Sequence, residues 1–359
     1  MKFSLPGFNS QSIVGLDVGS SSIKAVELSK KSKGKNFDLT HLGVAQVPAE
    51  AIVQGAFLNS SAITEAIQEA IENAKIKTNN VAAAVCGHSV IVKKVSLPQM
   101  TRDELDEQIR WEAEQYIPFD VNEVNLDFQI LESSDGEGQM DVLLVAAKKD
   151  LIDDYVQVIR EAGLTPVAVD VAGFAIENAF EVNYDTEPDD VIALVNIGAQ
   201  VVNINIMTGG VPCFTRDITT AGNQYTEEIQ KALSISFEEA ERIKLGGHGT
   251  DSQDVVPQEV EQAMQSVTET VIGEISRSLD FYAATTAESR INKVYLSGGS
   301  AKVSGLEAAF HERTGLDVET LNPLSRMLPS DRFDQEYLDD MSAALSVGVG
   351  LALREADAR

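Results

Sequence analysis

An aspartate, three serines and a lysine surround one glycine near the start of the chain, in GLDVGSSSIKAVEL at residues 15–28. Two interpretations fit this pattern. Ile13–Val18 and Ile23–Leu28 are apolar runs joined by turn residues, which is typical of a β-hairpin. Alternatively, the turn is a phosphate site, in which backbone N–H groups and hydroxyls face an anion, Lys24 adds positive charge and Asp17 holds a hydrated divalent ion.

The same pattern recurs about 180 residues later, where VNIGAQVVNINIM matches LDVGSSSIKAVEL. Both segments read as an apolar strand, a polar residue, a glycine turn and an alternating strand. Asp17 aligns with Asn196, and Gly19 aligns with Gly198. Internal similarity of this kind predicts two related lobes that each present a glycine turn, although short apolar motifs also match by chance.

A third glycine element lies in VYLSGGSAKVSGLEAAF, where a short strand runs into SGGS at residues 297–300 and then into a helical pattern that continues to Phe310. A junction of strand, glycine and helix places free N–H groups at a helix start and lets a ligand approach the backbone. An ordinary tight loop would show the same short motif. Three such elements in order are more specific than any one of them.

Together these motifs resemble the nucleotide site of the actin/Hsp70/hexokinase superfamily. Residues 17–24 look like its first phosphate motif, 196–202 like the second and 296–301 like its adenosine motif. Within that superfamily the chain is most similar to the PilM family of type IV pilus assembly, a relative of FtsA. The similarity spans nearly the whole chain and is strongest in VSLPQMTRDELDEQIRWEAEQYIPFDVNEVNLDFQIL (95–131) and VLLVAAKKDLIDDYVQVIREAGLTPVAVDVAGFAIENAF (142–180).

The resemblance implies ATP and Mg²⁺ between the two lobes, with Asp17 as a metal ligand that acts largely through water. Glu241 and Lys244 belong to an AE-x-x-K run that the resemblance places beside the nucleoside, and an exposed ion pair between helix neighbours is the alternative. The implied binding residues are Asp17, Gly19, Ser20, Ser21, Ser22, Lys24, Asn196, Gly198, Ala199, Gln200, Gly222, Glu241, Lys244, Gly298, Gly299 and Ser300.

The second phosphate motif departs from the family pattern, which usually has Asp where this chain has Asn196. One negative charge that would help to bind the metal or position water is therefore missing. General-base catalysis typically contributes about 10²- to 10⁴-fold to a rate. We expect ATP binding with slow or absent hydrolysis, and we assign no catalytic residue.

The resemblance also implies a cytoplasmic scaffold, peripheral at the inner membrane through a partner. That partner is the cytoplasmic N-terminal peptide of the membrane protein PilN, bound in a groove between lobe one and an inserted subdomain, and other pilus assembly proteins are expected nearby. Two alternatives stay open. One is an FtsA-like membrane-tethered filament protein, although the ending LALREADAR is short and partly acidic. The other is a small-molecule kinase of the same superfamily.

Composition agrees with a globular protein of this kind. The chain has 359 residues, is 43% hydrophobic and has a formal net charge of −28, which argues against a nucleic-acid-binding face. Its two cysteines and four histidines show neither a disulfide framework nor metal-ligand spacing. No signal peptide is indicated, and polar residues interrupt the longest uncharged stretch, 191–215, so we expect no membrane span.

These observations predict an α/β fold in which duplicated actin-like (RNase H-like) lobes surround a nucleotide cleft and one lobe contains an inserted α+β subdomain. Lobe one (1A) comprises residues 1–80, 165–188 and 330–359, and the inserted 1C subdomain comprises 81–164. Lobe two (2A) comprises 189–217 and 258–329, and a nucleoside-side subdomain (2B) comprises 218–257.

Local patterns predict the elements that hold the motifs in place. Apolar spacing predicts a helix over 60–74. Thr101, followed three residues later by Glu104, predicts a capping box at the start of a helix in the insert. We expect Trp111, on that helix, to pack against the neighbouring sheet. Gly348 and Gly350 predict a closely packed helix beneath the cleft.

Overall fold

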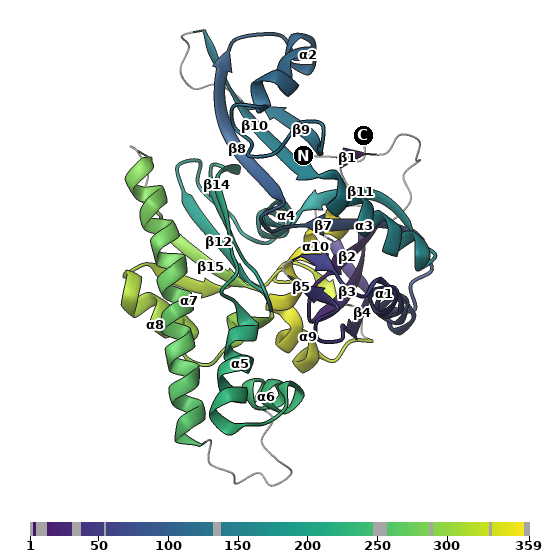
Figure 1. Ribbon diagram of the computed structural model, residues 1–359, viewed down its shortest axis with the longest axis vertical. Coiled ribbons are helices and arrows are strands. Elements are labelled where there is room, and N and C mark those ends of the chain that lie inside the picture. The colour runs from purple at the N-terminus through teal and green to yellow at the C-terminus, as the bar shows by residue number, and fades with distance from the viewer. Residues whose placement is uncertain are drawn as a thin grey trace.

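The computed structural model describes residues 3–4, 13–30, 37–53, 55–131, 138–246, 257–286, 290–329 and 332–354. Two lobes, each built on its own β-sheet, lie next to each other, and a smaller part projects beyond them (Figure 1). The α/β class predicted from the sequence is confirmed. Residues 247–256, at the end of the predicted 2B subdomain, lie outside the described residues.

Within the described residues, each lobe has one large sheet. The sheet of lobe one has seven strands in the order β1 (Phe3–Ser4), β11 (Thr165–Val171), β7 (Asn80–Val85), β2 (Val14–Val18), β3 (Ser22–Lys30), β4 (Phe37–Gln46) and β17 (Leu328–Pro329). The sheet of lobe two has five strands in the order β14 (Val211–Ile218), β13 (Val202–Thr208), β12 (Val191–Ile197), β15 (Lys293–Ser297) and β16 (Asp317–Thr320).

The two sheets share one topology. In lobe one, β2, β3 and β4 form an antiparallel meander, and β7 and β11 continue the sheet in parallel beside β2. In lobe two, β12, β13 and β14 form the same meander, and β15 and β16 continue in parallel beside β12. The lobes are therefore duplicated, as the sequence repeat predicts.

Helices cover the sheets and fill the junction between the lobes. In lobe one, α1 (Ser60–Ala74) and α3 (Lys149–Glu161) share a buried core with β2, β3 and β7. In lobe two, α7 (Gln258–Thr285) and α8 (Leu306–Thr314) pack on the sheet. The helices α5 (Gly222–Leu233) and α6 (Phe237–Lys244) lie at one end of this lobe (Figure 1). The short elements are β5 (Ile52–Val53), β6 (Ala56–Phe57), α9 (Gln335–Met341), and the 3₁₀ turns η1 (Gly299–Lys302) and η2 (Ser342–Leu345).

At the centre, α4 (Ala172–Asn183) packs against α10 (Ser346–Ala352). A methyl group on Gly350 would lie 1.6 Å from the carbonyl oxygen of Ala175, and one on Gly15 would lie 1.9 Å from that of Gly348. Only glycine permits these backbone contacts, so the close packing predicted for this helix is present. No helix in the described part of the chain is both long enough and apolar enough to cross a membrane.

The insert has a three-stranded sheet of its own, in the order β8 (Val90–Pro98), β10 (Gln139–Lys148) and β9 (Val124–Ile130), covered by α2 (Arg102–Ala113). The capping box of Thr101 and Glu104 is formed. Trp111 is 66% exposed, so the expectation that it packs against the sheet is wrong. Leu105, Ile109 and Ala113 form the buried face of α2, and Trp111 is not on it.

Sheet membership supports an insert that is shorter than the predicted residues 81–164. β7 pairs with β2 and β11 in the sheet of lobe one, and α3 shares the buried core of that lobe. The separate sheet and core comprise only β8 to β10. We therefore propose that the insert comprises residues 90–148.

Candidate functional site

The first glycine turn joins β2 to β3. The Gly19 N–H donates to the Ser22 carbonyl oxygen at 3.2 Å, and a methyl group at Gly19 would lie 2.9 Å from that oxygen. Asp17 and Lys24 face each other across the two strands, and Nζ lies 3.1 Å from Oδ2. This pair places one positive and one negative group beside the backbone of the turn. Ser20 and Ser21 occupy the turn itself, and the Ser21 carbonyl accepts the Val47 N–H.

The second turn repeats this geometry between β12 and β13. The Gly198 N–H donates to the Val201 carbonyl oxygen at 3.0 Å, and a methyl group at Gly198 would lie 2.9 Å from that oxygen. Asn196 faces Asn203, and their side chains are hydrogen-bonded at 3.0 Å. Residues 17, 19, 22 and 24 therefore correspond to 196, 198, 201 and 203, and a neutral amide pair replaces the ion pair of the first lobe.

The third element packs directly on the second turn. Gly298 has φ +88°, donates its N–H to the Ala343 carbonyl, and leaves no room for a methyl group, which would lie 2.4 Å from the Ile197 oxygen. Ser300 Oγ donates to the Gly198 carbonyl at 3.3 Å. The helical pattern expected through Phe310 is interrupted, because η1 ends after one 3₁₀ turn and α8 begins only at Leu306.

The remaining glycines of the candidate site differ in their surroundings. The Gly222 N–H donates to the Gly198 carbonyl at 3.0 Å, and a methyl group at Gly222 would lie 2.0 Å from Ser300 Oγ. A methyl group at Gly299 would have no heavy atom within 4 Å. Gly222 is therefore required by protein packing, whereas Gly299 faces open space.

Glu241 and Lys244 lie next to Gly222. Lys244 Nζ is 2.6 Å from a Glu241 carboxylate oxygen, 3.1 Å from Thr226 Oγ1 and 3.5 Å from the Gly222 carbonyl oxygen. Thr226 also donates to Glu241. The side chain of Lys244 is only 6% exposed. The exposed ion pair considered as an alternative is therefore not what the structure contains.

Contacts with lobe one and with neighbouring parts of lobe two hold the second turn in place. Gln200, in the second turn, donates from Nε2 to the Ile52 carbonyl of lobe one at 2.6 Å. The third element and Gly222 contact the second turn directly, and Lys244 contacts Gly222. Ala199 accepts the Asn223 N–H at 2.6 Å, which holds the start of α5 against the turn.

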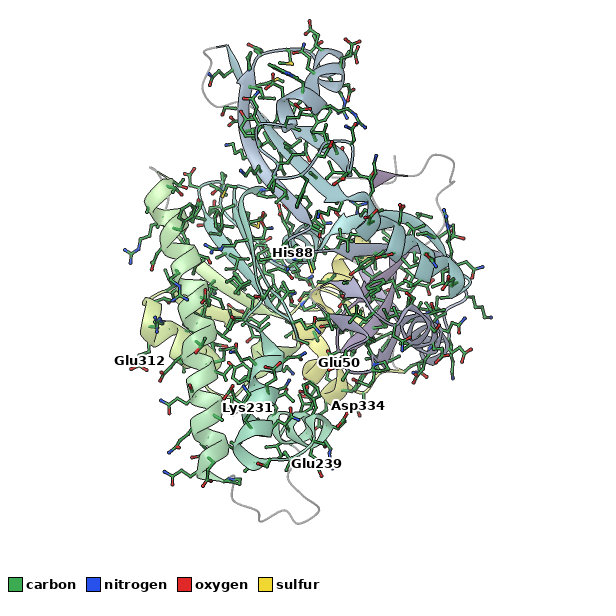
Figure 2. The ribbon with its side chains drawn as sticks, viewed as in Figure 1. Glu50, His88, Lys231, Glu239, Glu312 and Asp334 are labelled. Atoms are coloured by element: carbon green, nitrogen blue, oxygen red, sulfur yellow. The ribbon has the colours of Figure 1, made fainter. Side chains whose placement is uncertain are left out.

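A polar network that was not predicted from the sequence also crosses between the lobes. Asn203 Nδ2 donates to Asp217 Oδ1 at 2.8 Å, and the other oxygen of Asp217 accepts the N–H of Gly87. Gly87 follows β7 of lobe one, immediately before His88, which lies near the centre of the molecule (Figure 2). The repeat contains a signal for Asn203, because the offset that aligns Asp17 with Asn196 aligns Lys24 with Asn203.

Two groups in this network have altered acidity. Asp217 keeps access to solvent, but the dense protein around it desolvates its carboxylate and raises its pKa. Burial raises the pKa of the Cys86 thiol to about 12, with further contributions from the charges of Asp217 and Asp17. The thiol therefore lies near one carboxylate from each lobe and stays protonated at neutral pH.

The donor set suits a phosphate group better than a bare metal ion. A side chain at Gly19 or Gly198 would crowd the backbone of its turn. Lys24 adds positive charge beside the first turn. Within the described residues, no cluster of three His, Cys, Asp or Glu side chains is arranged to hold a metal. Asp17 would hold Mg²⁺ only together with water and phosphate oxygens, which is the usual manner for this ion. The residues present therefore fit a Mg²⁺–nucleotide.

A family model described as type IV pilus assembly protein PilM matches residues 15–356. The chain belongs to this PilM family. A solved PilM–PilN type IV pilus biogenesis complex is similar to it, with 29% identity, a TM-score of 0.86, and coverage of 97% of this chain and 100% of that one. This likeness confirms the resemblance inferred from the sequence.

More distant relatives support the actin-like architecture of this PilM-family chain. The cell division protein FtsA of Escherichia coli K12 is 22% identical over 255 residues, which cover 65% of this chain and 60% of FtsA. The chain thus spans less than two thirds of the length of that relative. The structure of MreB 5 of Spiroplasma citri bound to AMPPNP has a TM-score of 0.52 at 12% identity and covers 97% of each chain. At that identity it supports the fold alone.

Proposed function

We propose that this PilM-family chain is an ATP-binding scaffold of type IV pilus assembly that docks the cytoplasmic N-terminal peptide of PilN. The main support is the pair of glycine turns with matching geometry, one in each lobe, the second of which contacts Gly298 and Gly222. The family match and the similar PilM–PilN complex support the pilus role and the partner. Attachment to the inner membrane would come through PilN, with further pilus assembly proteins joining there.

Each lobe would contribute a different kind of contact to the nucleotide. The free N–H groups of the two turns would donate to phosphate oxygens. Lys24 would turn from its ion pair with Asp17 toward the phosphate, and the Asp17 carboxylate would then order water around Mg²⁺. Mg²⁺, when bound, would supply positive charge to the phosphate oxygens. Glu241, Lys244 and the backbone at Gly298–Ser300 would contact the nucleoside. Contacts with both lobes would stabilise their closed arrangement.

The residues near the second turn support slow or absent hydrolysis. The Asn196 side chain is a neutral amide, so it cannot act as a base. Its Nδ2 donates a hydrogen bond to Asn203 Oδ1. Both oxygens of the neighbouring Asp217 already accept hydrogen bonds. Among the described residues of the second turn, none is therefore a free base that is positioned to activate water, and ATP would act as a structural or switching ligand.

Isothermal titration with Mg²⁺–ATP tests the proposal. Lys24→Met removes the positive charge, and charge-assisted hydrogen bonds are worth about 1.5–3 kcal/mol, so we expect about 10- to 100-fold weaker binding. Lys231→Met, on the exposed surface of α5, is the matched control and should bind as the wild type does (Figure 2). Equal affinities for the two variants would contradict the assigned site. Rapid ATP turnover that Asp17→Ala abolishes would contradict the scaffold role.

The partner is tested separately with a synthetic peptide of the PilN cytoplasmic N-terminus. Titration should show saturable binding to the full chain, and addition of Mg²⁺–ATP reports whether the two ligands are coupled. Absence of binding both with and without ATP would exclude this peptide as the partner while leaving the nucleotide site untouched.

A further inference from the structure

A pocket of about 560 Å³ lies between the insert and lobe two, away from the glycine turns. Residues 92–96 of β8 form one wall, and residues 212–215 of β14 form the other. Tyr116, Leu143 and Phe281 complete it. None of the residues of the candidate nucleotide site lines this pocket, and it lies on the lobe-two side of the insert rather than in the groove implied for the PilN peptide.

Both walls are edges of β-sheets. Among the described strands, β8 pairs only with β10, and β14 pairs only with β13. The two edges approach each other at Val92, whose carbonyl oxygen accepts a long hydrogen bond of 3.5 Å from Thr215 Oγ1. They do not pair as strands. An edge strand presents a row of N–H and C=O groups that an extended peptide can pair with.

The lining of the pocket is apolar and aromatic. Leu143 is buried, and the rings of Phe214 and Phe281 lie 6.2 Å apart between their centroids. Phe281 is 54% exposed, although large apolar side chains on helices usually face the core. An apolar side chain of a bound peptide would cover this ring and gain free energy from the water that it displaces.

The charge at the pocket is opposite in sign to that of the whole chain. The chain has 56 acidic and 28 basic residues, yet the pocket lining includes two lysines and no Asp or Glu. Lys94 is paired with Asp141 at 2.9 Å. Lys93 is exposed and has no ion pair or hydrogen bond with any described residue. A carboxylate is the group that best complements this lysine.

We propose that the pocket binds an extended segment of a partner protein that adds as a strand to the free edge of β8, with apolar residues against Phe214 and Phe281 and a carboxylate at Lys93. This occupant is distinct from the PilN peptide, whose implied groove lies between lobe one and the insert. The proposal does not depend on nucleotide binding or on PilN.

Fluorescence anisotropy with two labelled eight-residue peptides tests this site on the full chain. One peptide alternates valine and glutamate, and the other alternates valine and lysine. We expect the glutamate peptide to bind and the lysine peptide to bind at least about 10-fold more weakly. Lys93→Glu should weaken the glutamate peptide about 10- to 100-fold, because a favourable charge contact becomes a repulsive one.

Lys77→Glu is the matched control, because it makes the same charge change at an exposed residue of lobe one, outside the pocket. It should leave binding within about twofold of the wild type, and Phe281→Ala should weaken both peptides. Thermal unfolding of each variant verifies that the fold is retained. Failure of the glutamate peptide to bind, equal binding of the two peptides, or equal losses in Lys93→Glu and Lys77→Glu would each overturn the proposal.

Discussion

Gly299→Ala separates the packing of the protein from the binding of its ligand. A methyl group at Gly299 would meet no heavy atom of the described chain within 4 Å, and the backbone there does not adopt the left-handed region. The substitution should therefore not reduce stability, and replacing glycine by alanine at a compatible position usually adds about 0.4–1 kcal/mol. The same methyl group would occupy the space in which the nucleoside is proposed to lie.

The expected cost falls on binding alone. Pressing an extra methyl group into a packed contact costs about 1–3 kcal/mol, and each 1.4 kcal/mol is a factor of ten in affinity. Gly299→Ala should therefore bind Mg²⁺–ATP about 5- to 100-fold more weakly, as measured by isothermal titration. Its thermal unfolding midpoint without nucleotide should equal or exceed that of the wild type.

Gly222→Ala gives the opposite pattern and serves as the comparison. Its methyl group would lie 2.0 Å from Ser300 Oγ, so the protein itself must shift, and we expect a loss of about 1–3 kcal/mol of stability before any ligand is added. If Gly299→Ala binds ATP as tightly as the wild type, the nucleoside does not lie against this glycine. If Gly299→Ala instead unfolds like Gly222→Ala, the open space inferred beside it is wrong.

Three further predictions concern the junction between the lobes. Burial raises the pKa of Glu177 to about 8, whereas in the unfolded state this carboxyl releases its proton near pH 4.5. The free energy of unfolding should therefore fall by about 1.4 kcal/mol per pH unit as pH rises from 4.5 to 8. Urea unfolding at pH 6 and pH 9 should show this fall, and Glu177→Gln, which can still accept the hydrogen bond from Asn205, should flatten it; an unchanged slope in the variant would contradict the assignment. Because the pKa of Cys86 is about 12, iodoacetamide should label this thiol at pH 7.5 far more slowly in the native protein than in urea, and equal rates would show that the junction is open. Gly350→Ala places a methyl group 1.6 Å from the Ala175 carbonyl oxygen, so denaturant unfolding should show a loss of about 1–3 kcal/mol in the free energy of unfolding. A stability equal to that of the wild type would refute the close packing of α10 on α4.

Much of the fold could be predicted because its signals are local. The helix expected over 60–74 and the capping box at Thr101 are present at those positions. Apolar spacing at 3.6 residues and side-chain caps act between residues that are close in sequence, so they can be read without the fold. The repeat added long-range information, since two copies of one pattern imply two copies of one sheet topology.

The packing expected for Trp111 failed because it depended on which neighbour a helix meets. Trp111 lies on an amphipathic helix, but burial depends on which residues of α2 face the sheet, and Leu105, Ile109 and Ala113 already fill that face. Similarly, β7 reads as part of the insert because it precedes β8 in the sequence. Its pairing with β2 and β11 supports the proposed start of the insert at residue 90.

The amino-acid sequence alone specifies both glycine turns, the duplicated strands around them and the absence of an acidic residue at Asn196. It does not specify that Asp217 joins Asn203 to Gly87, although Asp217 and Gly87 are 130 residues apart in the sequence. Nor does it specify that β8 and β14 form the walls of one pocket. Turn and strand preferences act over a few residues. Contacts between segments that are distant in sequence exist only when the two sheets and the insert have packed together.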